Sequence, residues 1–205
     1  MAPAVELTRY DSGMAECSAF ILAGGRSTRM GRDKAELLLD GRTLLGRAQA
    51  LARELTERVY IVGPRARFGA GAVEDIYANR GPLGGIHAAL TTSQTDLNLM
   101  LPVDTPFLAP EFLRFLVQEA ERCGSTVTVP VAGGRNQTLC AVYRRAFAVL
   151  AEEALRAGHN KIDPLFADVT VREITEREIV ELAFDPRMFD NLNTPEDLDR
   201  AQSRR

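Results

Sequence analysis

Hydrophobic and polar positions alternate along the chain in two different ways. Three short stretches, 19–22, 59–62 and 97–103, are almost continuously apolar, which is typical of strands buried on both faces of a parallel sheet. Segments 44–57 and 110–122 instead carry apolar residues at helical spacing, with charged residues between them. Because strands and helices alternate, we expect right-handed crossovers and an α/β fold with a mostly parallel sheet.

The second half of the chain predicts a different strand arrangement. Segments 126–130 and 139–143 are expected to pair as strands across the turn at 132–135, followed by a helix over 144–156. An alternating pattern over 169–174 predicts a last strand.

Glycine and proline residues mark further turns. An Asp-Gly pair at 40–41, between short apolar runs, predicts a hairpin. A short strand is expected at 73–75. The glycine-rich turn at 80–85 is expected to lead into a helix over 86–92, in which His87 is interpreted as a packing or hydrogen-bonding residue rather than a catalytic one.

Composition restricts the class of protein. The chain has 205 residues, 45% of them apolar, so we expect a loose tail over 1–17 and a single domain with a sizeable core over 18–205. No run approaches the ~20 apolar residues that span a bilayer, and the first residues lack the features of a signal peptide, so we expect no membrane contact and a cytoplasmic location. The three dispersed cysteines are expected to stay reduced. A net charge of −3 argues against nucleic acid as a partner.

The segment from Ser18 to Lys34 reads SAFILAGGRSTRMGRDK and is the strongest candidate site. A strand ends at Gly24 and Gly25, and without side chains there the backbone N–H groups can approach phosphate oxygens. Four cations lie within nine residues: Arg26, Arg29, Arg32 and Lys34. The spacing matches neither the dinucleotide fingerprint nor the nucleoside-triphosphatase loop. The segment predicts binding of a polyanion, with a basic surface loop as the alternative.

Lys34 and Lys161 are the only two lysines among 25 basic residues. A lysine kept among so many arginines indicates a place for a compact ammonium rather than a planar guanidinium. For Lys34 the glycine-rich segment supports this interpretation. Lys161 lies in the polar stretch 158–161 and is a candidate for binding an acceptor substrate, but chance retention, or a cation at a helix C-terminus, explains it about as well.

Asp104 is the candidate metal ligand. It follows a very apolar predicted strand, just before Pro106, and so lies at the carboxyl end of the sheet, where α/β proteins bind ligands. Mg²⁺ usually takes one or two protein carboxylates and fills its shell with water and phosphate oxygens. The alternative, an N-cap for the helix near Pro110, is disfavoured because that helix begins too late. Asp75 also follows a predicted strand and could accept hydrogen bonds from a base or ribose, unless it is a turn or capping residue.

The pattern LAGG-x-S-x-RMG-x-DK at 22–34 resembles the signature loop of the nucleotidyltransferases related to molybdenum cofactor guanylyltransferase, which transfer GMP from GTP to molybdopterin and release pyrophosphate. The resemblance covers 18–202. Three later motifs also match, namely Gly-Pro-Leu-x-Gly from Gly81, Asp-x-Pro from Asp104 and Asn-x-Asn-Thr-Pro from Asn191. The resemblance implies a three-layer Rossmann-like nucleotidyltransferase fold, with a mostly parallel central sheet and helices on both faces.

The resemblance also implies roles for individual residues. Nucleotide contacts are expected for Leu22, Ala23, Gly24, Gly25, Lys34, Asp75, Gly81, Gly84 and Asp104. Catalytic roles are expected for Arg29, Lys34 and Asp104, with Mg²⁺ bound to Asp104. Asn191 and Asn193 are expected to hydrogen-bond the acceptor or to order the waters of the metal, and they join Lys161 as acceptor candidates. A purely structural helix entry is the alternative for the turn that contains Gly81.

One segment departs from the resembling family. Relatives usually place a proline shortly before the strand at 139–143, where this chain reads Asn136-Gln137-Thr138. Because that segment lies toward the acceptor in the family, the departure bears most on the contacts to the pterin.

The implied substrates are GTP and molybdopterin, and the implied protein partners are enzymes that make or receive molybdopterin, met transiently. Two other interpretations remain open. The first is a transferase of the same fold that uses CTP or a sugar phosphate, although cytidylyl relatives usually carry Ala-Ala-Gly in place of the Ala-Gly-Gly at 23–25. The second is a nucleotide-binding regulator without turnover, against which the presence of Lys34 and Asp104 argues.

Overall fold

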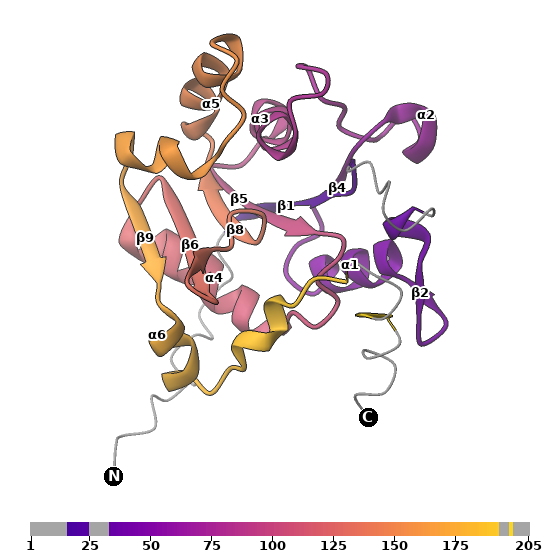
Figure 1. Cartoon of the computed structure of the whole chain (residues 1–205), viewed down its shortest axis with the longest axis vertical. Coiled ribbons are helices and arrows are strands. Elements are labelled where there is room, and N and C mark those ends of the chain that lie inside the picture. Colours follow the sequence, from indigo (N-terminus) through magenta and orange to yellow (C-terminus); the bar gives the residue numbers. More distant parts are fainter. Residues whose placement is uncertain (1–15, 25–32, 193–196, 199–205) are drawn as a thin grey trace.

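The computed structural model of the chain describes residues 16–24, 33–192 and 197–198. Within these residues, strands assemble into one central sheet in the order β4-β1-β5-β8-β6-β7, with β9 paired to β6 (Figure 1). The strands are β1 (Cys17–Leu22), β4 (Val59–Val62), β5 (Leu97–Pro102), β6 (Val127–Ala132), β7 (Arg135–Asn136), β8 (Ala141–Arg144) and β9 (Val171–Ile174).

The direction of the strands confirms a mostly parallel sheet. β1 lies between β4 and β5 and is parallel to both. β8 is antiparallel to both β5 and β6, whereas β9 is parallel to β6. Because β1 and β5 have neighbours on both edges and helices on both faces, nearly all their residues are buried, which explains their continuous apolar sequence.

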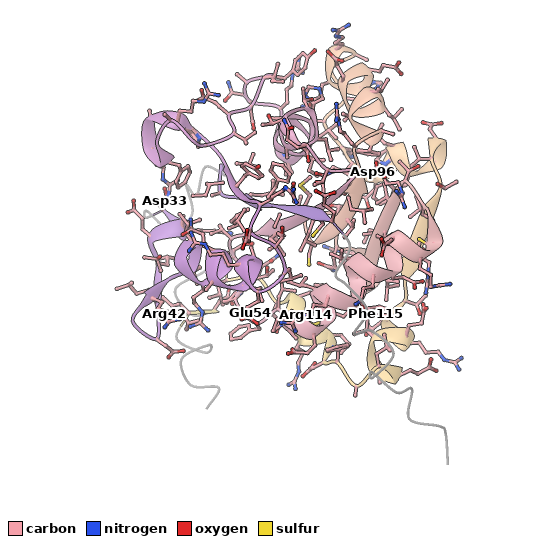
Figure 2. All side chains as sticks on the ribbon, turned by 180° about the vertical axis from the view of Figure 1, so that it is seen from behind. Asp33, Arg42, Glu54, Asp96, Arg114 and Phe115 are labelled. Carbon is pink, nitrogen blue, oxygen red and sulfur yellow. The ribbon has the colours of Figure 1, made fainter. Side chains whose placement is uncertain are left out.

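Helices cover both faces of the sheet, as the three-layer expectation requires. α1 (Leu44–Arg53) and α4 (Pro110–Cys123) lie on one side, and α3 (Pro82–Thr92) and α5 (Phe147–Arg156) lie on the other (Figure 1). Alternate residues of β1 point to opposite faces: Ala19 and Ile21 belong to the core under α1 and α4, and Phe20 to the core under α3 and α5. At the surface an ion pair of 3.3 Å joins Arg114 of α4 to Glu54, the residue after α1 (Figure 2).

Of the short elements before α1, the hairpin at 40–41 was predicted and the 3-10 helix before it was not. The 3-10 helix η2 (Lys34–Glu36) leads into an antiparallel hairpin of β2 (Leu38–Leu39) and β3 (Arg42–Thr43). Its turn residues Asp40 and Gly41 both have positive φ, at 52° and 75°. Asp and Gly tolerate this conformation, which matches the twist of the two strands.

Several predicted helix boundaries are wrong. α1 ends at Arg53 rather than near residue 57. α3 begins at Pro82 rather than at residue 86, because Gly81 takes a φ of 65° as N-cap and a proline suits the first helical position. α5 begins at Phe147 because Arg144 still belongs to β8.

The predicted strand at 73–75 is reduced to one parallel bridge between Val62 and Val73.

The predicted pairing of 126–130 with 139–143 is confirmed, but the connection across 132–135 contains an additional short strand that was not predicted. Gly133 and Gly134 form a tight turn with φ of 58° and 69°, so the chain folds back at once and β7, not the later strand, pairs with the end of β6. A second turn, closed by a 2.8 Å bond from the Cys140 amide to the Gln137 carbonyl, then brings the chain into β8. β6 and β8 do pair antiparallel, as expected, but one turn later.

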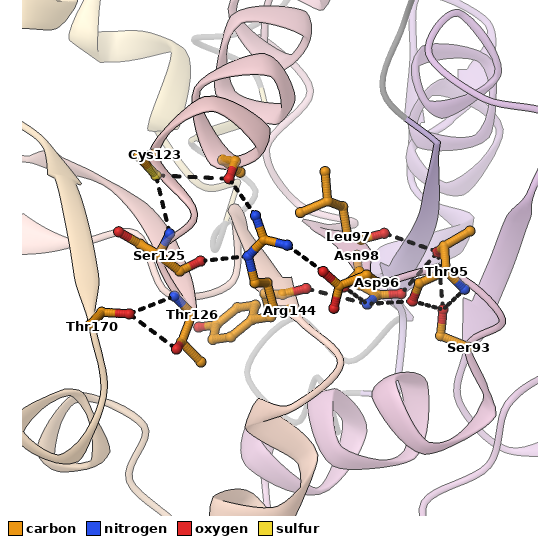
Figure 3. Close-up of polar contacts among 12 residues, drawn as sticks. Ser93, Thr95, Asp96, Leu97, Asn98, Cys123, Ser125, Thr126, Arg144 and Thr170 are labelled. Carbon is orange, nitrogen blue, oxygen red and sulfur yellow. Dashed lines mark hydrogen bonds and ion pairs between the residues drawn. The ribbon is translucent and has the colours of Figure 1, made fainter.

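A buried polar cluster fastens the amino end of β5 to its neighbours (Figure 3). Thr95 donates a 2.8 Å hydrogen bond to Ser18 of β1, and Asn98 donates to the carbonyls of Asp96 at 2.9 Å and Tyr143 at 3.3 Å. Arg144 of β8 is ion-paired with Asp96. These contacts satisfy the buried polar groups at the amino end of β5.

Some smaller elements and single residues complete the chain. The remaining elements are α2 (Arg65–Phe68), η3 (Asp163–Asp168), α6 (Glu176–Glu181) and η4 (Pro186–Phe189). The cysteines Cys17, Cys123 and Cys140 are free thiols, as expected. Among the described residues, no helix has the length and apolar character needed to cross a bilayer.

A charged network holds β9 and α6 against α4. Arg172 of β9 bonds to the buried carboxylate of Glu119 at 2.8 Å and to Glu178 of α6 at 2.5 Å. Glu178 also accepts hydrogen bonds from the amide and hydroxyl of Thr175, closing a capping box. The hydrogen bond from Arg172, and then those from Thr175, lower the pKa of Glu178 from its usual 4.5 to about 2.

We expect Glu178→Gln to lower the free energy of unfolding by about 1–2 kcal/mol at pH 7, because glutamine keeps the capping geometry and loses the charge that Arg172 needs. The pKa of Glu178 is lower in the folded than in the unfolded state, so its charge stabilises the fold above pH 4.5 and this stabilisation is lost as pH falls toward 2. The difference between variant and parent should therefore disappear over that range in urea titrations. Glu181→Gln on the same helix, at an exposed pair with Arg177, is the control and should change little. An equal loss at pH 7 and pH 2.5 would contradict the prediction.

Candidate active site

A cleft of about 730 Å³ lies at the carboxyl ends of β1, β4 and β5. It is within the range of volumes that enclose small-molecule ligands. Its walls are formed by residues from the ends of these strands, from the segment before α3 and from η2, namely 22–24, 33–34, 62–64, 74–75, 78–79, 81–82, 85 and 102–104, together with Leu139. The position agrees with the expectation for a parallel sheet, because crossover loops meet at this edge.

Lys34 and Asp104, the two catalytic candidates described by the structure, contact each other in this cleft. The Lys34 ammonium donates a 2.7 Å hydrogen bond to Oδ2 of Asp104, although the two residues are 70 positions apart in the chain. Both side chains are mostly shielded, with 22% and 18% of their surfaces exposed. A cation and a carboxylate thus share one partly desolvated position in the wall of the cleft.

Local structure explains where these two groups lie. Asp33 is the N-cap of η2, and its side chain accepts a 3.0 Å hydrogen bond from the Ala35 amide, which sets the start of the helical turn that carries Lys34. Asp104 follows β5 in a turn in which the buried Thr105 hydroxyl donates to the Pro102 carbonyl at 3.2 Å. The helix after this turn, α4, has Ala109 as its N-cap, so Asp104 does not cap it.

The end of β1 forms a narrow part of the cleft. Leu22, Ala23 and Gly24, for which nucleotide contacts are expected, all line it. A Cβ atom on Gly24 would lie 3.5 Å from the Cα atom of Gly63, so the two backbones approach closely at this point. Glycine at both positions keeps backbone groups accessible from the cleft.

Asp75 lies over the first turn of α3. A Cβ atom on Gly84 or Gly85 would lie 3.4 Å and 3.6 Å from the Asp75 carboxylate oxygens, so this side chain packs directly against the start of the helix. Burial, and then the nearby charge of Glu74, raise the pKa of Asp75 above its usual 3.8. Gly81 is the N-cap of α3, so the interpretation of Asp75 as a cap of this helix is wrong.

The amino end of α3 opens onto the cleft through Gly81, Pro82 and Gly85. Helix amino ends carry a partial positive charge and unpaired N–H groups, both of which favour an anion or a polar base edge. The turn therefore serves as a structural helix entry and as a wall of the cleft at the same time. His87, one turn further on, is buried and packs edge-on against the ring of Tyr77 at 5.4 Å, as expected for a packing residue.

The acceptor candidates lie in different places. The Leu192 amide donates a 2.9 Å hydrogen bond to the Asp104 carbonyl, which brings the segment containing the exposed Asn191 beside the metal candidate. Lys161 is exposed and follows α5, and it is not part of the cleft wall. Its neighbour Asp163 accepts a 3.4 Å hydrogen bond from Asn136, in the segment that departs from the resembling family.

Some predicted residues lie outside the described part of the chain, namely Gly25, Arg26, Arg29, Arg32 and Asn193. Other residues of the cleft wall were not predicted, namely Asp33, Val62, Gly63, Pro64, Glu74, Ala78, Asn79, Pro82, Gly85, Pro102, Val103 and Leu139. For Gly63 and Pro64 the signal was present, because a Gly-Pro pair directly after a buried strand marks the edge of the sheet where ligands bind. Leu139 carried no such signal, since it lines the cleft only because β8 pairs with β5.

Comparison with known proteins agrees with this geometry. The family model of the MobA-like NTP transferase domain matches residues 19–172. A probable molybdenum cofactor guanylyltransferase from Pelotomaculum thermopropionicum is 36% identical over 92% of this chain and 93% of the relative. A molybdenum cofactor guanylyltransferase from Desulfosudis oleivorans is 32% identical over 91% and 94%.

Solved structures show the same fold. Molybdopterin-guanine dinucleotide biosynthesis protein A from Archaeoglobus fulgidus superposes with a TM-score of 0.79 at 26% identity, covering 91% of this chain and 97% of that one. A 2-C-methyl-D-erythritol 4-phosphate cytidylyltransferase from Thermus thermophilus, 21% identical over 92% of this chain and 98% of that one, has a TM-score of 0.68 and shares the fold alone. Sheet order, the position of the cleft and these similarities lead to one conclusion: the chain belongs to the MobA-like NTP transferase family and is a nucleotidyltransferase.

Proposed function

We propose that this enzyme transfers GMP from GTP to molybdenum-bound molybdopterin, forming molybdopterin guanine dinucleotide and pyrophosphate. The observation that carries the proposal is the Lys34–Asp104 pair in the wall of a nucleotide-sized cleft. The names of the relatives supply the substrate class, because two relatives at least 32% identical are called molybdenum cofactor guanylyltransferases. Molybdenum cofactor biosynthesis is then the context in which the chain acts.

In the proposed reaction, an oxygen of the acceptor's terminal phosphate attacks the α-phosphorus of GTP. The bond between the α-phosphorus and its bridging oxygen breaks, and pyrophosphate leaves with the electron pair. Such a transfer depends on positioning and charge neutralisation more than on a covalent nucleophile. The Lys34 ammonium, on a turn set by Asp33, is placed to neutralise charge that grows on the α-phosphate and the leaving group.

Asp104 is the residue that we assign to Mg²⁺, and the groups present fit this ion. Its carboxylate is a hard oxygen ligand at the end of β5 in the wall of the cleft, and it would hold the ion there. When bound together with the nucleotide, Mg²⁺ supplies positive charge beside the phosphates.

The rest of the cleft divides between nucleotide and acceptor. We assign the guanine nucleotide to the side lined by Gly24, Asp75 and the amino end of α3, where backbone donors and a carboxylate lie together. We assign the acceptor to the side of Asn191, which the hydrogen bond between Leu192 and Asp104 brings next to the reacting groups. Gly25, Arg29 and Asn193 keep the roles expected from the resemblance. Lys161, which is not part of the cleft wall, remains an acceptor candidate.

The proposal includes four statements beyond the site. Residues 18–205 act as one catalytic domain, and the enzyme works in the cytoplasm. It receives or delivers the pterin through transient contacts with enzymes of the same biosynthetic sequence. Neither nucleic acid nor membrane takes part.

Thermal unfolding with GTP, ATP, CTP or UTP, each with Mg²⁺, tests the proposed nucleotide. At 100 times its dissociation constant, GTP should stabilise the fold by about 2.7 kcal/mol, and the other three nucleotides should stabilise it less. Release of pyrophosphate from GTP should then require molybdenum-bound molybdopterin. Preferential protection by CTP would assign the chain to a cytidylyl reaction, and protection by none of the four would overturn the proposed function.

A further inference from the structure

We propose that α2 (Arg65–Phe68) positions the catalytic lysine, with Arg67 acting on Lys34 through Asp33. This inference rests on the proposed function for what Lys34 does. The added residue, Arg67, touches neither substrate nor metal and lies 33 positions after Lys34 in the chain. The contacts of α2 also connect the two described ends of the glycine-rich segment, at Gly24 and at Asp33.

The contact between Arg67 and Asp33 is the first observation. The Arg67 guanidinium is ion-paired with Oδ2 of Asp33, and each side chain is 26% exposed. Asp33 uses its other carboxylate oxygen, Oδ1, to accept the Ala35 amide at 3.0 Å as N-cap of η2. The Asp33 carboxylate, labelled in Figure 2, therefore joins α2 to the turn that carries Lys34.

The packing of Phe68 is the second observation. The Arg67 guanidinium lies over the Phe68 ring at 4.3 Å, which orients both side chains. A Cβ atom on Gly63 would lie 2.7 Å from the Phe68 ring, so the ring can occupy this position only because residue 63 is glycine. Gly63 in turn contacts Gly24 at the end of β1. The same short helix thus fixes a position at each end of the segment.

α2 is itself held in place from a third side. The Arg65 amide donates to Glu74 and its guanidinium donates to the Ala72 carbonyl, both at 3.2 Å. These bonds connect α2 to the stretch that leads to Asp75. α2 therefore connects three walls of the cleft through polar or aromatic contacts.

Lys34 needs this support because neither its helical turn nor its own side chain is rigid. η2 is a single turn of three residues, and a lysine side chain has a long flexible stem, so neither holds an ammonium in one position alone. Burial lowers the pKa of Arg67, which indicates that its guanidinium has given up hydration for its contacts with protein groups. An ion pair with a desolvated guanidinium and a hydrogen-bonded carboxylate is more rigid than an exposed pair.

A double-mutant cycle of Arg67→Met and Asp33→Asn tests the proposal. Asparagine keeps the N-cap but not the ion pair, and methionine keeps apolar contact with Phe68 but not the charge. In the protein without nucleotide, hydrogen exchange at the amides of residues 35–37 should accelerate by about tenfold in each single variant, as expected for loss of one partly buried ion pair. The double variant should exchange no faster than the single ones. Arg53→Met, at an exposed arginine of α1, is the matched control and should leave these rates unchanged.

Turnover gives the second readout. Both single variants should lower kcat by about 10- to 100-fold, with a much smaller change in KM for GTP, because the misplaced ammonium matters most when charge develops. Arg67→Lys should recover part of kcat, since a cation can again reach Asp33. Unchanged hydrogen exchange, or effects of the two substitutions that simply add, would overturn the role of Arg67. A wild-type protein that fails to bind GTP would instead overturn the proposed function and leave the exchange result as a separate test of the contact.

Discussion

Replacement of Asp104 by asparagine is expected to reduce kcat by about three orders of magnitude, the largest loss among the substitutions considered. The carboxamide has almost the same shape, but it is neutral and a poor ligand for Mg²⁺, so positive charge beside the phosphates is lost. It also removes the partner of the Lys34 ammonium, which lies 2.7 Å away. Steady-state pyrophosphate release at saturating GTP measures the loss.

A binding experiment separates the metal role of Asp104 from a structural one. In the parent enzyme, addition of Mg²⁺ should increase the thermal protection that GTP provides, and in the Asp104→Asn variant this increase should vanish while the ligand-free melting temperature changes little. Asp168→Asn, at an exposed carboxylate at the end of η3, is the matched control and should behave like the parent. Retention of the Mg²⁺-dependent protection in the Asp104 variant would contradict the assignment.

Substitution of Lys34 by alanine is expected to lower kcat by about two to three orders of magnitude, comparable to removal of one preorganised donor from a transition-state site. The fold should survive, because the ion pair with Asp104 is partly exposed and contributes modestly to stability. Single-turnover kinetics with bound GTP measure the chemical step directly. A melting temperature close to that of the parent should accompany the loss.

Lys34→Arg is the informative companion variant. It keeps a positive charge in the cleft, but the planar guanidinium is broader than an ammonium and cannot occupy the 2.7 Å contact with one carboxylate oxygen in the same way. We therefore expect recovery of GTP binding with little recovery of kcat. Near-normal turnover of Lys34→Ala would show that the ammonium has no catalytic role.

The two predictions are linked because the residues occupy one position in the cleft. Lys34 and Asp104 were each inferred from a local pattern, a lysine after a glycine-rich segment and an aspartate after an apolar strand. Their contact was not inferred, since it depends on η2 folding back toward the end of β5. Effects of the two substitutions on kcat should consequently be less than additive in the double variant.

Several features followed from sequence because they depend on local physical rules. The continuous apolar runs of β1 and β5 reflect burial on both faces, and strands of this kind lie in the interior of a parallel sheet. The same expectation is wrong for β4, which lies at the edge of the sheet and is mostly half-buried. The hairpin at Asp40 and Gly41 followed from their tolerance of positive φ. The site followed from the rule that ligands bind at the carboxyl edge of such a sheet, supported by the resemblance to the family.

Other predictions were wrong because the features depend on competition between neighbouring residues along the chain. α3 starts four residues earlier than expected, since a proline at the first position and a glycine N-cap outweigh the low helix propensity of Gly84 and Gly85. The strand β7 was missed because the Gly133–Gly134 turn allows immediate pairing with β6, and two paired residues leave no hydrophobic period to detect.

The sequence by itself determined the α/β class, the central strands, the resemblance to the family and the choice of Lys34 and Asp104 as candidates, because each rests on patterns that can be recognised segment by segment along the chain. Only the tertiary structure decided which of these groups meet: the ion pair across 70 positions, the approach of Asn191 to Asp104 through the Leu192 amide, and the support of η2 by Arg67. Contacts between distant segments depend on how helices and loops pack across the sheet. The local propensity of each segment does not determine that packing.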